Sequence, residues 1–96
     1  MGLHFEWNKE KTALNIKNHK VSFDEASTVF DDPLARIFDD EDHSLDECRE
    51  IIIGHSVLNR LLLVSFTERA EATIRIISAR LVTKQECKDY EQNTSF

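Results

Sequence analysis

The chain has little of what breaks regular structure and none of several motifs that mark common enzymes. Only two glycines and one proline occur among its 96 residues, while 41% of the residues are hydrophobic and 31% are charged. This composition disfavours a disordered or fibrous chain. The phosphate-binding P-loop, the dinucleotide-binding GxGxxG, the GxSxG of serine hydrolases and the HExxH of zinc proteases are all absent. The reactions that depend on these motifs are therefore disfavoured.

Cysteine and long apolar runs are also scarce. Cys48 and Cys87 stand alone without a CxxC spacing, so we expect two free thiols in a reducing compartment rather than a disulfide or a zinc site. The runs III and LLLV are too short to cross a bilayer, and the N-terminus has no apolar stretch of signal-peptide length. The sequence thus predicts a cytoplasmic protein without membrane contact, built as one domain over residues 1–96.

Charge is unevenly distributed along a chain whose formal net charge is -6. Residues 24–50 carry eleven acidic side chains against two arginines, a net charge of -9. Residues 51–84 carry four arginines and one lysine against two glutamates, a net charge of +3. The acidity therefore belongs to the middle third, and a nucleic-acid surface remains open to the rest of the chain, although an acidic whole weakens long-range steering towards a polyanion.

The N-terminal third is predicted to form a strand and a helix. In FEW at residues 5–7, Phe and Trp alternate with Glu, which is typical of a short strand. Asn8 is a good N-cap for a helix, and Ala13, Ile16 and Val21 follow at spacings that predict one apolar face.

The rest of the chain predicts a second helix, four strands and a closing helix. Ser22 and Glu25 form a capping-box pattern that opens the second helix, which ends before Pro33. Thr83 and Glu86 form another such pattern before the last helix. The strand candidates between them, joined by links of hairpin length, are LARIF, REIIIGHSV, RLLLVSF and TIRIISA. The result is an α+β fold, a small antiparallel sheet with N-terminal helices and a C-terminal helix in the order β-α-α-β-β-β-β-α.

An acidic stretch, DDEDHSLDE at residues 39–47, separates the first two of these strands. We interpret it as a solvated hairpin loop. A divalent-cation site between Asp39 and Asp46 is the alternative, because hard cations prefer oxygen ligands, but the stretch lacks the glycine and the spacing of a calcium loop.

The last strand candidate and the residue after it read TIRIISAR and contain two arginines five residues apart, Arg75 and Arg80. Strict alternation puts Arg75 on one face and Ile74, Ile76, Ser78 and Arg80 on the other, but Arg80 lies where the strand gives way to the helix, so its direction is not fixed. In the strand REIIIGHSV, alternation groups Arg49, Ile51, Ile53 and His55 without fixing which face is open.

Several guanidinium groups on one sheet would suit a phosphate, which they bind bidentately, but arginines are poor general bases because they do not lose their charge. A proton acceptor would have to be a nearby carboxylate or imidazole. The candidates are Glu68, His19, His55 and Glu47.

An ordered set of motifs from Phe5 to about Tyr90 resembles the BrnT family, the toxin member of a bacterial type II toxin-antitoxin pair. The set comprises FEW, Asn15, His19, VSFDEA, VFDDP, Glu47 with Arg49, IG, the RLLLV segment, TER, RIISAR, TxxE and Tyr90. The matching positions with charged or polar family features are His19, Glu47, Arg49, Arg60, Glu68, Arg69, Arg75, Ser78, Arg80 and Tyr90. Departures also occur, since Asn8 stands where members usually have Asp, Asn18 where Lys usually precedes the histidine, and Lys20 where Gly usually follows it.

The resemblance implies a RelE-like endoribonuclease that cleaves RNA without a metal or another cofactor and arrests growth. It implies neutralisation by a BrnA-like ribbon-helix-helix antitoxin in a heterotetramer, with operator DNA bound only through the antitoxin. The catalytic residues that we predict are Arg75, Arg80, Glu68 and His19. The RNA-binding residues that we predict are Arg49, Arg60, Arg69 and Tyr90. The alternative is a module without catalytic activity that binds the antitoxin and acts with it as a co-repressor.

Overall fold

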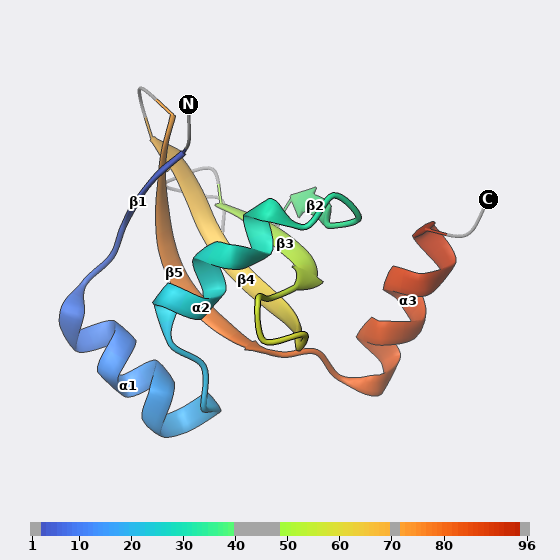
Figure 1. Ribbon diagram of the computed structural model, residues 1–96, viewed down its shortest axis with the longest axis horizontal. Coiled ribbons are helices and arrows are strands. Elements are labelled where there is room, and N and C mark those ends of the chain that lie inside the picture. The colour runs from blue at the N-terminus through green and yellow to red at the C-terminus, as the bar shows by residue number, and fades with distance from the viewer. Residues whose placement is uncertain (1–2, 40–48, 70–71, 95–96) are drawn as a thin grey trace.

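The computed structural model describes residues 3–39, 49–69 and 72–94 of the chain (Figure 1). In chain order the elements are β1 (His4–Glu6), α1 (Lys9–His19), α2 (Phe23–Thr28), the short 3-10 helix η1 (Val29–Asp31), β2 (Arg36–Asp39), β3 (Arg49–His55), β4 (Leu61–Arg69), β5 (Thr73–Leu81) and α3 (Lys84–Thr94). The predicted order of strands and helices is confirmed. No helix in this part of the chain is long and apolar enough to cross a membrane. The predicted acidic loop, apart from Asp39 but including Glu47, lies outside the described residues, and so does Cys48.

The five strands form one sheet in the order β1-β5-β4-β3-β2. Strands β2 to β5 pair antiparallel, as their short connections predict. Strand β1 instead pairs parallel with β5, with Glu6 opposite Arg75. Because no tight turn joins β1 to β5, their connection allows a parallel as well as an antiparallel pairing. The sheet is therefore mostly antiparallel, with its two edges at β1 and β2.

The main core lies between one face of the sheet and the α2 segment, which crosses in front of the strands in Figure 1. Its buried residues are Val21, Phe23, Ala26, Val29, Ile52, Leu62, Val64, Phe66, Ile74, Ile76 and Ala79. Phe30 joins two parts of this core, because its ring packs edge-on against Phe5 at 5.2 Å and against Phe66 at 5.0 Å. The alternation in FEW, which puts Phe5 and Trp7 on one side, is confirmed, since both pack against the core.

Helix α1 contacts the sheet through a polar residue rather than through the predicted apolar face. Leu14 and Ile16 are 56% and 46% exposed, and Asn15 is only 6% exposed. The Asn15 amide donates to the carbonyls of Val21 and Ala79 at 2.8 and 2.7 Å, and its oxygen accepts from the Ala79 N–H at 3.1 Å. The prediction was wrong because β1 is short. Beyond β1 the edge of β5 needs a hydrogen-bonding partner, and Asn15 takes that place.

The predicted helix caps are confirmed in two cases and half confirmed in the third. Asn8 accepts from the N–H groups of the first turn of α1. Before α3, the Thr83 hydroxyl accepts from the Glu86 N–H at 3.2 Å and the Glu86 carboxylate accepts from the Thr83 N–H at 2.9 Å. Ser22 likewise caps α2 by accepting from the Glu25 N–H. The Glu25 carboxylate, however, points away from this cap to another partner.

The opposite face of the sheet carries a smaller apolar cluster under α3, which stands apart from α1 and α2 in Figure 1. Tyr90 of α3 packs there with Ile53 and Leu63. Gly54 lies on the face of the main core, on the α2 side, because a Cβ at this position would point there and lie 2.8 Å from the Ala35 Cβ. The alternation in β3 is thereby resolved, and Arg49, Ile51, Ile53 and His55 lie on the α3 side.

Candidate functional site

A bulge in β5 brings the two arginines of RIISAR to the same face of the sheet. The ladder with β4 uses Ser78 and then Ile76, which leaves Ile77 as an extra residue in β5. Alternation restarts beyond Ile77, so Ser78 and Arg80 lie on the same face as Arg75. The alternation that grouped Ser78 with the core residues was wrong, because strict alternation assumes an unbroken ladder. The direction of Arg80, which alternation left open, is on the side of Arg75. We call this face, which carries Arg49, Arg75 and Arg80 opposite α1 and α2, the arginine face.

Arg49, Thr67 and Arg75 lie side by side across three neighbouring strands. Arg49 pairs with Thr67, and Thr67 pairs with Arg75. Neighbouring strands are about 4.8 Å apart, so the Cα atoms of the two arginines are separated by about 10 Å. Long side chains on one face can converge over such a distance. The buried Thr67 between them, 6% exposed, leaves this row without a bulky side chain at its centre.

Glu6 extends this row at the sheet edge, and sequence reasoning missed it. It stands opposite Arg75 in the β1–β5 ladder, and the Arg75 Nη1 donates to the Glu6 Oε2 at 2.9 Å. The Arg69 Nε lies 3.8 Å from the same oxygen. The signal in the sequence was its position in FEW, where the two aromatic neighbours face the core and the carboxylate must face the other side. The sequence does not show which distant strand lies beside Glu6.

Arg80 lies on the same face about 13 Å from Arg75, because their β4 partners are four residues apart. Both terminal nitrogens of Arg80 donate to the two oxygens of Glu86, each at 2.7 Å. The hydrogen bonds from Arg80 outweigh burial and lower the pKa of Glu86 from its usual 4.5 to about 2. Arg80 and Arg75 therefore do not meet at one point, and each arginine is paired with a carboxylate.

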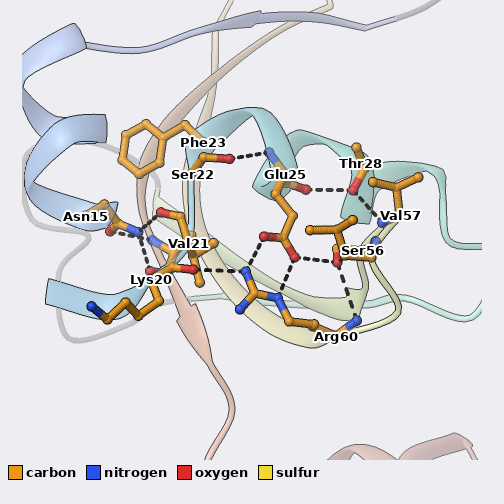
Figure 2. A network of polar contacts seen from close by, with 12 residues as sticks. Asn15, Lys20, Val21, Ser22, Phe23, Glu25, Thr28, Ser56, Val57 and Arg60 are labelled. Atoms are coloured by element: carbon orange, nitrogen blue, oxygen red, sulfur yellow. Dashed lines mark hydrogen bonds and ion pairs between the residues drawn. The ribbon is translucent and has the colours of Figure 1, made fainter. Parts of the chain in front are cut away.

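Arg60 has a different environment, on the side of α2 (Figure 2). Its guanidinium donates to both oxygens of the buried Glu25 and to the carbonyl of Lys20. The Ser56 hydroxyl also donates to Glu25, at 2.6 Å. The hydrogen bond from Arg60 lowers the pKa of Glu25 in spite of burial. This network ties the α1–α2 connection to the β3–β4 turn, and the structure does not bring Arg60 to the row of Arg49 and Arg75.

The predicted proton acceptors are scattered. Glu68 pairs with Ile74, so it lies on the face opposite Arg75 and is exposed. His19 is the exposed last residue of α1, one turn beyond the Asn15 that contacts Ala79. His55 is on the arginine face, but six residues along β3 from Arg49, about 20 Å away. None of the three stands in the row formed by Arg49, Thr67 and Arg75, where the carboxylate is that of Glu6.

Tyr90 is held by packing and by a hydrogen bond to the β2 side of the sheet. Its hydroxyl donates to the carbonyl of Leu34 at 3.0 Å, and its ring lies edge-on to His55 at 6.3 Å. Burial, and then the charge of Asp32, raise the pKa of the Tyr90 hydroxyl. The residue thus fixes α3 against the sheet and borders the arginine face at the same time.

The chemistry available on the arginine face is that of guanidinium, hydroxyl and carboxylate groups. Within residues 3–39, 49–69 and 72–94 no group of three His, Cys, Asp or Glu side chains could hold a metal ion. Cys87 is a free thiol, as predicted. A row of two arginines about a small hydroxyl residue suits an oxyanion such as a phosphate diester, with a carboxylate beside it.

Comparisons with known proteins agree with this architecture. The family described as the ribonuclease toxin BrnT of type II toxin-antitoxin systems matches residues 7–86. The crystal structure of the Brucella abortus ribonuclease toxin BrnT is similar in fold, with a TM-score of 0.66 and 20% sequence identity, covering 85% of this chain and 99% of that one. No curated protein sequence matches the chain. The family match covers most of the sequence and includes the strands that build the arginine face, and the chain therefore belongs to the BrnT family of ribonuclease toxins of type II toxin-antitoxin systems.

Proposed function

We propose that the chain cleaves RNA at a phosphate bound between Arg49 and Arg75, without a metal ion. The observation that carries the proposal is the register that aligns Arg49, Thr67 and Arg75 on one face. Two guanidinium groups there supply fixed positive charge for the phosphate as charge develops in the transition state. A well-placed donor of this kind is worth about 3 to 4 kcal/mol, or roughly 10² to 10³ in rate.

The reaction is attack by the neighbouring 2′-hydroxyl on phosphorus. The new bond joins the 2′-oxygen to phosphorus, and the bond from phosphorus to the 5′-oxygen breaks. The 2′-hydroxyl proton passes to a general base, and the leaving 5′-oxygen takes a proton from water, which leaves a 2′,3′-cyclic phosphate on one product and a 5′-hydroxyl on the other. This route needs only the RNA and the protein, because the 2′-hydroxyl is the nucleophile, and it explains a preference for RNA over DNA.

Glu6 is the general base in this proposal. Its carboxylate contacts Arg75, so a phosphate bound to Arg75 brings the ribose hydroxyl near it. Glu68 and His19 remain the bases predicted from the sequence, but Glu68 lies on the opposite face. Arg80, about 13 Å along the same face from Arg75, would contact a neighbouring part of the RNA rather than the scissile phosphate.

A cleavage assay on purified protein with single-stranded RNA in EDTA tests the proposal. Cleavage should survive the chelator, and Arg75→Ala should lower the rate about 10² to 10³-fold. Lys11→Ala, which removes an exposed cation from α1, is the matched control and should keep the wild-type rate. Loss of cleavage in EDTA would contradict metal independence, and a fully active Arg75→Ala protein would contradict the phosphate site.

A second series identifies the base. Glu6→Gln should lower the rate and remove the acid limb of the pH–rate profile, while Glu68→Gln and His19→Ala should leave that limb in place. If His19→Ala or Glu68→Gln removes the acid limb instead, the assignment of Glu6 is wrong.

A type II toxin has a cognate antitoxin, and we propose a BrnA-like ribbon-helix-helix protein that forms a heterotetramer with this chain and carries the contacts to operator DNA. Such a complex would act in the cytoplasm, where RNA and operator are both present. The structure also favours one alternative to catalysis, because Arg75 and Arg80 are already paired with carboxylates. A module without catalytic activity that only binds the antitoxin would show tight antitoxin binding and no cleavage of RNA in the same assay.

A further inference from the structure

Strand β1 directs two polar side chains to the arginine face, and the proposed function uses only one of them. Phe5 packs against the main core, so its neighbours His4 and Glu6 point to the opposite side of the sheet. Glu6 shows this direction by its hydrogen bond with Arg75. The backbone N–H of His4 donates to the Ala72 carbonyl at 2.9 Å and holds the start of the strand in place. His4 is therefore the second polar side chain of β1 on this face.

The register places His4 next to the proposed phosphate row. In the β1–β5 ladder Glu6 stands opposite Arg75, and His4 stands opposite Thr73. Two residues along a strand span about 7 Å, so the Cα atom of His4 lies about 7 Å from that of Glu6 and roughly 8 Å from that of Arg75. The charged side chains that face His4 from the neighbouring positions are Glu6, Arg69, which pairs with Thr73, and Arg75. Because His4 is exposed, RNA bound at Arg75 can reach it.

One step of the proposed reaction has no side chain to assist it. As the bond from phosphorus to the 5′-oxygen breaks, this oxygen gains negative charge and needs a proton, which water supplies. A positioned acid typically speeds such a step by about 10² to 10⁴-fold. Among the described residues of this face, the guanidinium groups do not release a proton, and His55 lies about 20 Å from Arg49. An imidazole can both hold and release a proton near neutral pH.

We propose that His4 is the general acid of the cleavage reaction and donates a proton to the leaving 5′-oxygen. The proposal rests on the ribonuclease function above and adds a further catalytic residue to it. The 2′-oxygen bonds to phosphorus while Glu6 takes the 2′-hydroxyl proton, and the bond to the 5′-oxygen breaks while protonated His4 gives its proton to that oxygen. Afterwards His4 regains a proton from water and Glu6 releases one to water, so the protein returns to its starting state without a co-reactant.

The spacing of His4 and Glu6 suits this division of roles. The entering and leaving oxygens of an in-line displacement stand on opposite sides of phosphorus. The base and the acid must therefore stand apart, each within a hydrogen bond of about 2.7 Å of its own oxygen. Alternate residues of one strand meet this condition, because their side chains project from the same face about 7 Å apart. Arg75, opposite Glu6 in the neighbouring strand, holds the phosphate beside both.

The test compares an ordinary RNA oligonucleotide with one that carries sulfur in place of the 5′-bridging oxygen at the cleavage position. A thiol loses its proton at about pH 8.5, so a thiolate leaves without an acid, whereas an alkoxide needs a proton. On the ordinary RNA, His4→Ala should lower the cleavage rate of the full chain about 10² to 10⁴-fold, and on the sulfur-containing RNA less than about tenfold. Leu3→Ala, which truncates the exposed neighbour of His4, is the control and should keep the wild-type rate on both.

The two substrates also separate the acid from the base and from the phosphate site. Glu6→Gln should slow cleavage of both RNAs, because both need a base for the 2′-hydroxyl. His4→Ala should remove the alkaline limb of the pH–rate profile on the ordinary RNA, because the reaction needs the protonated imidazole. Equal losses in His4→Ala on the two RNAs, or a full rate on the ordinary RNA, would overturn the role of His4. If cleavage in that case still depends on Arg75, the proposed function stands, whereas a wild type that cleaves neither RNA would overturn both.

Discussion

Replacing Glu86 with glutamine should make the protein less sensitive to acid. The Arg80 hydrogen bonds lower the pKa of Glu86 from 4.5 to about 2. At about 1.36 kcal/mol per pKa unit, this shift corresponds to about 3.4 kcal/mol of folding free energy. The Glu86 side chain is 26% exposed, so solvent screening lowers the contribution, and we expect about 2 kcal/mol.

The sign follows from the direction of the shift. Because the folded-state pKa is lowered, the contribution is complete above the unfolded value of 4.5 and is lost as the pH falls towards 2. Between pH 6 and pH 3, Glu86→Gln should therefore lose roughly 1 kcal/mol less of its free energy of unfolding than the wild type does. Glutamine can still serve at the third position of the capping box, so the start of α3 is kept.

Urea unfolding at pH 6, 4.5 and 3 measures this difference. The lowered pKa of Glu25 contributes equally to both proteins and cancels in the comparison. Glu10→Gln, an exposed change in the first turn of α1, is the control and should follow the wild-type pH dependence. Parallel pH dependences of the wild type and Glu86→Gln would refute the coupling between Arg80 and Glu86.

Three further substitutions test the fold around the site. Lys20 ends α1 with a φ of 61°, a conformation that favours glycine. Lys20→Gly should therefore raise the free energy of unfolding by up to about 1 kcal/mol, measured in urea. Gly54→Ala should lower it by about 1 to 3 kcal/mol, because the new Cβ would lie 2.8 Å from the Ala35 Cβ; an unchanged urea midpoint would contradict this close approach. Arg60→Met should lower the thermal midpoint more than Arg69→Met does, because Arg60 holds the buried Glu25. RNA binding by the folded Arg60→Met protein should be retained. Equal midpoints, or lost RNA binding in Arg60→Met alone, would contradict its structural role.

Local features of this fold could be predicted because their causes are local. The N-caps at Asn8, Ser22 and Thr83 need only a side chain and the next turn of helix. The antiparallel strands β3 to β5 are apolar runs joined by short links, and few other arrangements pair them. The motifs that resemble the BrnT family are also local, because each is a short segment that can be read without knowing which strands pair.

The features that could not be predicted depend on pairing between distant segments. The extra residue Ile77 is an ordinary strand former, and nothing beside it in the sequence marks a bulge. The pairing of Glu6 with Arg75 spans 69 positions. Asn15 is buried because β1 is too short to cover β5, and this depends on the length of another strand. Each of these three features decides where a charged or polar side chain lies, because such residues follow the register of the strands rather than local propensity.

The same register explains how an acidic protein can present the surface that we propose for RNA. Most of the negative charge falls in residues 24–50. Arg75 and Arg80 come from outside that segment, and the register places Arg49, near its end, on the same face of the sheet. Screening at physiological ionic strength has a length of about 8 Å, shorter than the spacing between the arginines along β5. A phosphate on the arginine face therefore responds to its immediate neighbours, Glu6 and Glu86, more than to the net charge of the chain. In the function that we propose, these two carboxylates pair with Arg75 and Arg80 until RNA binds, so affinity depends on close contact rather than on long-range attraction.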